Sequence, residues 1–270
     1  MSSSPRRLTS LLGWTPHSYY LLSGFLLILG LIAYVWWPLG QAYLSYIDWK
    51  GPWWLYFDWL LVGIFLAMSF LIMAKADLRY DAVIVFVGFC GGLVIESWGT
   101  QTNLWFYYTA ERPPLWIIPA WPIASLAIDR LWRGMEKGIR EKGKGRGDKI
   151  LYWVVFGGFY GWMLVFVAPT FDKSLTWMAL LLCAFLILTP TDHRRLTLIF
   201  LAGAGLGYFL ERWGTTRECW TYYTRQTPPF FAVLAHGMAA VAFWRTQVVV
   251  EKILRIGIRG KGIREGASNP

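Results

Sequence analysis

The sequence predicts an all-α polytopic membrane protein with about eight transmembrane helices, arranged as two parallel four-helix repeats. Three observations predict this fold. Hydrophobic residues make up 56% of the 270 residues, and charged residues only 16%. The apolar residues form long blocks with the charges between them, and one stretch of nineteen residues occurs twice. No block shows the alternating pattern of a transmembrane barrel strand, so the blocks are expected to be helices.

Eight apolar blocks are candidates for membrane spans, because a helix needs about 17–25 residues to cross a hydrocarbon core. They cover residues 19–37, 53–74, 80–95, 114–131, 150–168, 175–189, 196–210 and 230–244. The first block is too long for the apolar region of a cleavable signal peptide, and no small-residue cleavage site follows it. We therefore expect residues 19–37 to form a true span.

The net charge of +10 is distributed as a topology signal. Segments rich in Lys and Arg lie before the first block and after the second, fourth, sixth and eighth blocks. Eight spans place all of these segments on one side, and such loops stay in the cytoplasm. The pattern predicts a multi-pass protein of the cell membrane with both termini cytoplasmic and no nucleic acid partner. Contact of residues 130–149 with anionic lipid heads is an alternative use of this charge.

The duplicated stretch reads ESWGTQTNLWFYYTAERPP from residue 96 and ERWGTTRECWTYYTRQTPP from residue 211. The copies align without a gap and share ten of nineteen residues, most of them rare types. The same offset of 115 residues also pairs Asp77 with Asp192 and Arg130 with Arg245. A fixed offset of this kind indicates an internal repeat. Each copy contains four apolar blocks, and an even number of spans gives both copies the same orientation.

The repeat divides the chain into four parts. We expect the first four-helix repeat at residues 1–133, a basic cytoplasmic linker at 134–149, the second repeat at 150–247 and a basic cytoplasmic tail at 248–270. The two repeats are expected to form one compact bundle, since each half alone would expose its inner face.

A glutamate opens each copy of the motif and continues a row of small residues. The rows are Gly88, Gly92 and Glu96 in the first copy and Gly203, Gly207 and Glu211 in the second. Residues four apart share one helix face, and small-residue stripes let helices approach closely in lipid. If the two helices flank the repeat axis, the stripes meet and the glutamates converge. Two close carboxylates do not both ionise easily, so one of them is a candidate catalytic acid and the other a base.

Two alternatives stay open for the glutamates. A carboxylate near the membrane interface can reach water or cap a helix turn, which is a purely structural role. Arg212, the residue after Glu211, could also neutralise that carboxylate.

The aromatic residues of the motif are candidates for the wall of a substrate pocket. They are Trp98, Trp105, Tyr107 and Tyr108 in the first copy and Trp213, Trp220, Tyr222 and Tyr223 in the second. Aromatic faces attract cations, which suits a protonated polyene or isoprenoid. The alternative is an interfacial belt, where Trp and Tyr are enriched in membrane proteins.

His236 is a further candidate binding residue, because it lies within the last apolar block and aligns with Trp121. An intramembrane histidine can bind haem, relay a proton or simply form a hydrogen bond in the packed interior. The repeat supplies no second histidine, so haem held by two histidines is not expected. The sequence also contains no Walker motif, no G-x-S-x-G and no metal-ligand cluster, and the three cysteines lack metal spacing. We therefore expect no cofactor and no metal.

The pattern E-x-W-G-T, then W-x-Y-Y, then Pro resembles integral-membrane proteins of carotenoid biosynthesis, the carotenoid hydratases and lycopene cyclases. The residues that carry it in the first copy are Glu96, Trp98, Gly99, Thr100, Trp105, Tyr107 and Tyr108. The resemblance implies a cofactor-free, proton-driven enzyme acting on a long polyene. The acidic pair that the cyclases carry after a proline is missing behind Pro113, Pro114 and Pro119, which argues against a cyclase reaction.

The expected function is therefore binding of, or proton-driven chemistry on, an apolar isoprenoid, carotenoid or membrane lipid in a pocket between the repeats. A non-catalytic subunit of a membrane complex is the first alternative, with a membrane-protein partner docked on the outer face. A transporter is the second, although the sequence lacks matching Gly/Pro-interrupted spans.

Overall fold

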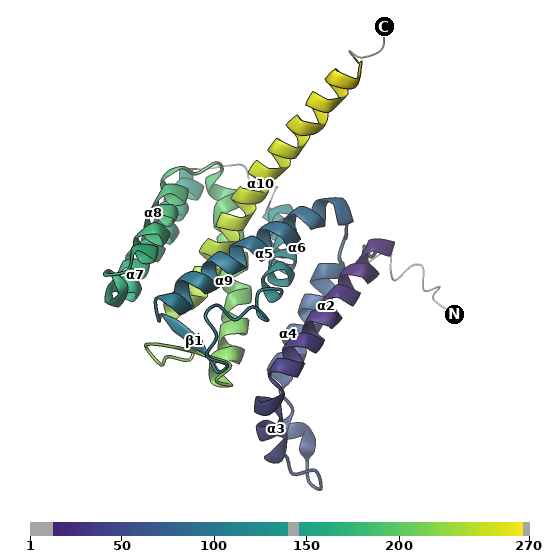
Figure 1. Cartoon of the computed structure of the whole chain (residues 1–270), viewed down its shortest axis with the longest axis vertical. Helices are drawn as coiled ribbons and strands as arrows, with labels where there is room; N and C mark the ends of the chain where they lie inside the picture. Colours follow the sequence, from purple (N-terminus) through teal and green to yellow (C-terminus); the bar gives the residue numbers. More distant parts are fainter. Residues whose placement is uncertain (1–12, 140–145, 267–270) are drawn as a thin grey trace.

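The structure is a computed structural model that describes residues 13–139 and 146–266. Residues 140–145 of the predicted linker, residues 267–270 of the predicted tail and residues 1–12 lie outside the described residues. Helices make up most of the described chain, as Figure 1 shows. The all-α prediction is confirmed, and the described residues add one short two-stranded sheet.

The helices run in the order α2 (Pro16–Val35), α3 (Trp37–Ser45), α4 (Trp59–Met73), α5 (Leu78–Gln101), α6 (Ala120–Ile139), α7 (Arg146–Val167), α8 (Ser174–Leu188), α9 (His193–Thr216) and α10 (Phe230–Gly266). Short 3-10 turns cover Trp53–Tyr56 and Ala168–Thr170. Strand β1 (Trp105–Tyr107) follows α5, and strand β2 (Trp220–Tyr222) follows α9; the two strands pair antiparallel.

Within the described part of the chain, four helices are long and apolar enough to cross a membrane: α2, α5, α7 with the turn after it, and α10 as far as Leu254. Helices α4 and α8 are apolar but only 15 residues long. Each predicted apolar block overlaps mainly one helix, but the second and fourth blocks begin several residues before α4 and α6. Crossing of the membrane by all eight stays a prediction. The second block is shorter as a helix because Asp58 caps α4, accepting the backbone N–H of Leu61 at 3.1 Å.

Helices α5 and α9 begin and end at positions that differ by the repeat offset, and each contains 24 residues. Asp77 and Asp192 cap their first turns through their side chains. Both helices continue for five residues beyond the motif glutamate, further than the loss of apolar residues predicts. The extra turn is stabilised by packing, because Gly99 and Thr100 are buried and the Thr100 hydroxyl donates to the Glu96 carbonyl at 2.6 Å.

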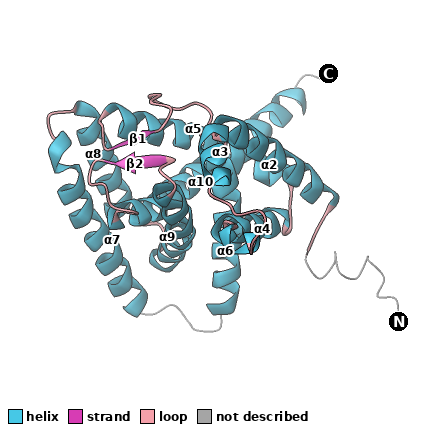
Figure 2. Ribbon diagram, turned by 90° about the horizontal axis from the view of Figure 1, so that it is seen from below, coloured by secondary structure: helices cyan, strands magenta, loops and turns pink. Residues whose placement is uncertain are grey.

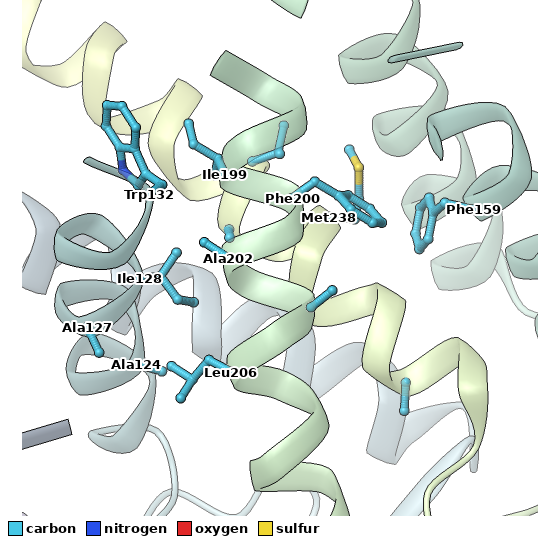
Figure 3. Packing of buried hydrophobic residues seen from close by; sticks show 14 of the residues in the cluster. Ala124, Ala127, Ile128, Trp132, Phe159, Ile199, Phe200, Ala202, Leu206 and Met238 are labelled. Atoms are coloured by element: carbon cyan, nitrogen blue, oxygen red, sulfur yellow. The ribbon is translucent and has the colours of Figure 1, made fainter. Parts of the chain in front are cut away.

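The centre of the molecule consists of α5, α6, α9 and α10. Helix α9 packs along α10, and α5 packs against α6. The two pairs are joined mainly by contacts of α6 with α9 and of α10 with α5. The pair α2–α4 covers one side of this centre and the pair α7–α8 the other, as Figures 1 and 2 show. Figure 3 shows α9 at the core: Leu206, Ala202 and Ile199 face α6, while Phe200 faces Phe159 of α7.

The two small-residue stripes face protein, but they do not meet each other as the repeat axis suggests. A Cβ on Gly92 would lie 2.5 Å from the side chain of Trp121 on α6. A Cβ on Gly207 would lie 2.5 Å from the side chain of His236 on α10. Each stripe therefore packs on the long helix that follows it in the chain, α6 after α5 and α10 after α9.

Replacing Gly203 with alanine is expected to destabilise the protein by about 1–3 kcal/mol, because the new Cβ overpacks a close helix contact. That Cβ would lie 2.7 Å from the His236 carbonyl oxygen, which is backbone and cannot rotate away. Gly205→Ala on the same helix is the matched control, since nothing lies within 4 Å of its Cβ position. Thermal unfolding in detergent checks this, and equal midpoints for the two variants would contradict the close α9–α10 packing.

Candidate functional site

The carboxylate of Glu96 is buried, with 3% of the residue exposed, and accepts three side-chain hydrogen bonds. The indole Nε1 of Trp105 donates to Oε2 at 3.0 Å. The hydroxyl of Tyr107 and the indole Nε1 of Trp121 donate to Oε1 at 2.9 Å and 3.0 Å. The three donors come from β1 and α6, so the glutamate on α5 joins three elements of the first copy.

The carboxylate of Glu211 has the same arrangement in the second copy. The indole of Trp220 donates to Oε2 at 2.9 Å, and the hydroxyl of Tyr222 donates to Oε1 at 2.8 Å. The third partner is His236, whose Nε2 lies 2.9 Å from Oε1. Every member follows its first-copy counterpart by the repeat offset, and the two clusters differ only where His236 replaces Trp121.

The glycine of each W-G-T stretch makes room for the indole that reaches the carboxylate. A Cβ on Gly99 would lie 1.9 Å from the ring of Trp105. A Cβ on Gly214 would lie 1.9 Å from the ring of Trp220. The ring therefore lies flat on the last turn of the helix, which directs its N–H back toward the glutamate one turn earlier.

The two carboxylate clusters contact each other through the sheet and through α6 and α10. The paired strand residues are Trp105 with Tyr222, Phe106 with Thr221, and Tyr107 with Trp220. The two outer pairs bring ring centroids to 5.9 Å in each case. The rings of Trp121 and His236 stack at 5.6 Å with an interplanar angle of 18°. Each donor to one glutamate thus touches a donor to the other.

The tyrosine hydroxyls remain protonated donors in this environment. Burial raises the pKa of Tyr107 well above its ordinary value, and the charges of Glu96 and, more weakly, Glu211 raise it further. Burial raises the pKa of Tyr222 in the same way, followed by the charges of Glu211 and then Glu96. Both hydroxyls therefore donate hydrogen bonds and do not act as phenolates.

Both glutamates line one cavity of about 1140 Å³. Its wall is mostly apolar and includes side chains from every helix between α2 and α10 except α3. Along α10 the lining residues run from Phe231 to Val250, which corresponds to about 28 Å at 1.5 Å per helical residue. The lining residues therefore extend over a length comparable to that of an extended lipid chain, and most of the polar ones lie near the glutamates.

Most of the residues predicted for the site lie on the wall of this cavity. They are Glu96, Trp98, Trp105, Tyr107, Glu211, Trp213, Trp220, Tyr222 and His236. Tyr108 and Tyr223 are not among its lining residues. The Tyr108 hydroxyl donates to the carbonyl of Val35, and the Tyr223 hydroxyl donates to the carbonyl of Phe166 at 2.7 Å. They point away from the glutamates because successive residues of an extended chain face opposite sides.

Arg212 does not pair with Glu211. Its guanidinium Nη1 donates to the carbonyl of Thr227 at 2.9 Å, on the loop that follows β2. Neighbouring residues of a helix point in directions about 100° apart, so the carboxylate faces the interior while the guanidinium faces the loop. The basic residue that contacts the Glu211 carboxylate is instead His236.

Sequence reasoning missed two parts of this site. Trp121 could have been found from the repeat offset, since it occupies the position of His236. No sequence pattern pointed to Asp58, because it contacts residues of the other copy. Its Oδ2 accepts the indole N–H of Trp213 at 2.8 Å and the Nε of Arg217 at 3.0 Å. Asp58 thereby ties the start of α4 to the end of α9.

Among residues 13–139 and 146–266, no group of three or more His, Cys, Asp or Glu side chains is arranged to hold a metal ion. The arrangement offers two buried carboxylates, one imidazole and a wall of aromatic rings. Comparisons of this chain with family models, with curated proteins and with solved structures found no match.

Proposed function

We propose that this chain is a multi-pass membrane protein that binds a long apolar isoprenoid or lipid between two four-helix units and acts on it by proton transfer. One observation carries the proposal: two buried carboxylates, Glu96 and Glu211, line the same largely apolar cavity of about 1140 Å³. Ligand cavities of this kind combine apolar walls with a few fixed polar groups.

The ligand is inferred from the shape and chemistry of the wall. An apolar channel about 28 Å long along α10 suits an extended hydrocarbon chain and not a compact polar metabolite. Aromatic rings at the glutamate end, among them Trp98 and Trp213, offer π faces to a cationic centre. These features support a polyene or isoprenoid, which is also what the resemblance to carotenoid hydratases suggests.

The proposed chemistry begins with a carboxylic acid. One glutamate gives its proton to a carbon of a C=C bond, which leaves a carboxylate on the protein and a carbocation on the other carbon. Aromatic faces and the carboxylate stabilise that charge in a site of low dielectric constant. Loss of a proton from an adjacent carbon to the second glutamate forms a shifted double bond. Alternatively, water adds to the carbocation and gives its extra proton to a glutamate carboxylate, which forms an alcohol.

The membrane arrangement is part of the proposal. Helices α4, α6, α8 and α9 would cross together with the four helices that are long and apolar enough, which gives eight spans in two parallel repeats. The basic segments would then lie in the cytoplasm together with both termini. The glutamate clusters would lie toward the outer side of the cell membrane.

Glu96→Gln and Glu211→Gln test the proposal, because glutamine keeps the shape of the side chain but removes its acid. Removing a general acid is expected to lower turnover by about 100-fold or more. Mass spectrometry of lipids from cells carrying each variant should show the substrate accumulating and the product lost. Glu111→Gln, on the exposed loop after β1, is the matched control. An unchanged lipid profile in both site variants would exclude the enzymatic role.

A non-catalytic role in a membrane complex is the second candidate, favoured by an exposed aromatic segment between α2 and α4. Trp37, Trp49, Trp54 and Trp59 are each more than half exposed there. Such residues suit either the membrane interface or a docked protein. Purification in mild detergent separates the candidates: a stoichiometric protein partner without bound isoprenoid would favour docking.

A further inference from the structure

The two carboxylate clusters differ in their ability to exchange a proton. In both, a tryptophan and a tyrosine donate to the glutamate through equivalent atoms. The third partner is the indole of Trp121 at Glu96 and the imidazole of His236 at Glu211. The two clusters therefore differ at a single position, and the difference is whether the third partner of the glutamate can give up and take back a proton.

The partners of Glu96 can donate hydrogen bonds but cannot carry protons. An indole N–H is a donor only, and the hydroxyl of Tyr107 is held protonated by burial and by the adjacent carboxylates. Glu96 is therefore a fixed acceptor with three donors in place. Glu211 faces an imidazole, whose ring nitrogens can both donate and accept a proton.

We propose that Glu211 and His236 form the proton-transfer pair of the site, while Glu96 is a positioning carboxylate that holds the aromatic wall and faces the developing positive charge. This inference rests on the proposed function only for what the transferred proton does. The contact between Glu211 and His236 is present whether or not that function is correct. It assigns the acid to one glutamate of the two.

The proton is transferred across the contact of 2.9 Å between Nε2 of His236 and Oε1 of Glu211. The imidazolium gives its Nε2 proton to the Glu211 carboxylate, which leaves a neutral imidazole and a carboxylic acid. The acid passes the proton to the substrate carbon and becomes a carboxylate again. His236 is the more accessible partner, with 17% of its side chain exposed against 5% for Glu211, so reprotonation by water reaches the histidine first.

The side chains that face Glu211 and His236 come from several neighbouring elements. Tyr222 on β2 donates to it, and across the sheet Tyr107 and Glu96 add one phenol and one carboxylate. Trp121 on α6 stacks on the ring of His236.

Two guanidinium groups near the end of α9 are directed to other acceptors. Arg212 donates to Thr227, and Arg217 pairs with Asp58 at 3.0 Å. The imidazole is thus the group in the described contacts of Glu211 that can take up a proton and pass it on.

Infrared titration of the purified full-length protein tests the assignment through the C=O band of a buried carboxylic acid. The wild type is expected to show one such band that changes with pH, absent in Glu211→Gln and retained in Glu96→Gln. His236→Trp, which copies the first cluster, should move the midpoint by at least about one pH unit. Trp121→His, which copies the second cluster, should create a second titrating band that Glu96→Gln removes.

His236→Gln serves where the larger exchange prevents folding, because it retains an N–H donor but cannot exchange a proton. A titrating band that belongs to Glu96 in the wild type would overturn the assignment. So would a Glu211 band whose midpoint is the same in His236→Trp and His236→Gln as in the wild type. A band that behaves as expected in a protein without isoprenoid chemistry would uphold the pair and reject the proposed function, so the two can fail separately.

Discussion

Asp81→Ala is expected to destabilise the protein by about 3–5 kcal/mol, because it leaves the charge of Arg130 buried without its main partner. The Nη2 atom of Arg130 donates to both carboxylate oxygens of Asp81 at 2.7 Å. The two side chains are 8% and 1% exposed. Arg130 also bonds Asp129 at 3.0 Å, but that carboxylate is shared with Arg133 and does not replace the lost pair.

This ion pair holds the end of the first copy that lies away from the glutamates. It joins α5 to α6, and the Nε of Arg130 donates to the carbonyl of Ala74 just after α4 at 3.1 Å. In the second copy Arg245 takes the same place, donating to the Leu186 carbonyl at 2.8 Å and to the Thr189 hydroxyl at 3.1 Å. Loss of Asp81 should therefore loosen three helices at once.

Denaturant unfolding in detergent, followed by tryptophan fluorescence, measures the effect. Asp172→Ala is the control, because Asp172 pairs with Lys173 at the surface with 63% of its side chain exposed, and its loss should leave stability unchanged. The double variant Asp81→Leu/Arg130→Met should recover much of the loss, since an apolar pair of similar volume can replace a buried ion pair. Wild-type stability in Asp81→Ala would contradict the buried pair.

Glu96→Ala is expected to cost about 3 kcal/mol or more, because it leaves three buried donors without an acceptor. Each unsatisfied donor costs about 1–3 kcal/mol, and the donors here are two indoles and one phenol. Glu96→Gln retains a carbonyl oxygen and the shape of the side chain, so its cost should be clearly smaller. The difference in the free energy of unfolding between the two variants measures how much the retained carbonyl acceptor stabilises this cluster.

Thermal unfolding of the two variants side by side measures this difference, and Glu111→Ala on the exposed loop is the control. A large loss in Glu96→Ala with a clearly smaller loss in Glu96→Gln, whose one carbonyl oxygen cannot serve the donors of both carboxylate oxygens, means that the glutamate supports the aromatic wall. Equal, small losses in both variants would show that the donors find water or another acceptor, and that the cluster is less closed than its geometry indicates.

The sequence predicts this fold well where the signal is local or repeated. Long apolar blocks locate the helices, and Asp77 and Asp192 mark the starts of α5 and α9 as capping residues. The offset of 115 residues brings both glutamates into equivalent places and aligns His236 with Trp121. These features depend on residue type and spacing alone, so they are readable without coordinates.

Other parts of the site depend on contacts that no spacing encodes. The glycine stripes pack on α6 and α10, and no residue spacing selects these partners over a contact between the two stripes. Asp58 contacts Trp213, which lies 155 residues later in the chain, and no sequence pattern predicts this contact. Tyr107 and Tyr108 are identical neighbours in the sequence, yet one reaches a glutamate and the other the end of α2, because the chain is extended there.

The cavity between the helices is expected to hold one apolar chain. Quantitative mass spectrometry of lipids that co-purify with the protein tests it most directly, with Ala179→Trp on α8 filling the cavity wall and Leu181→Trp, at a position 67% exposed on the same helix, as the control. We expect about one isoprenoid or lipid per wild-type chain. Ala179→Trp should lose it and Leu181→Trp should retain it. Equal amounts of bulk membrane lipid in all three proteins would contradict a ligand cavity.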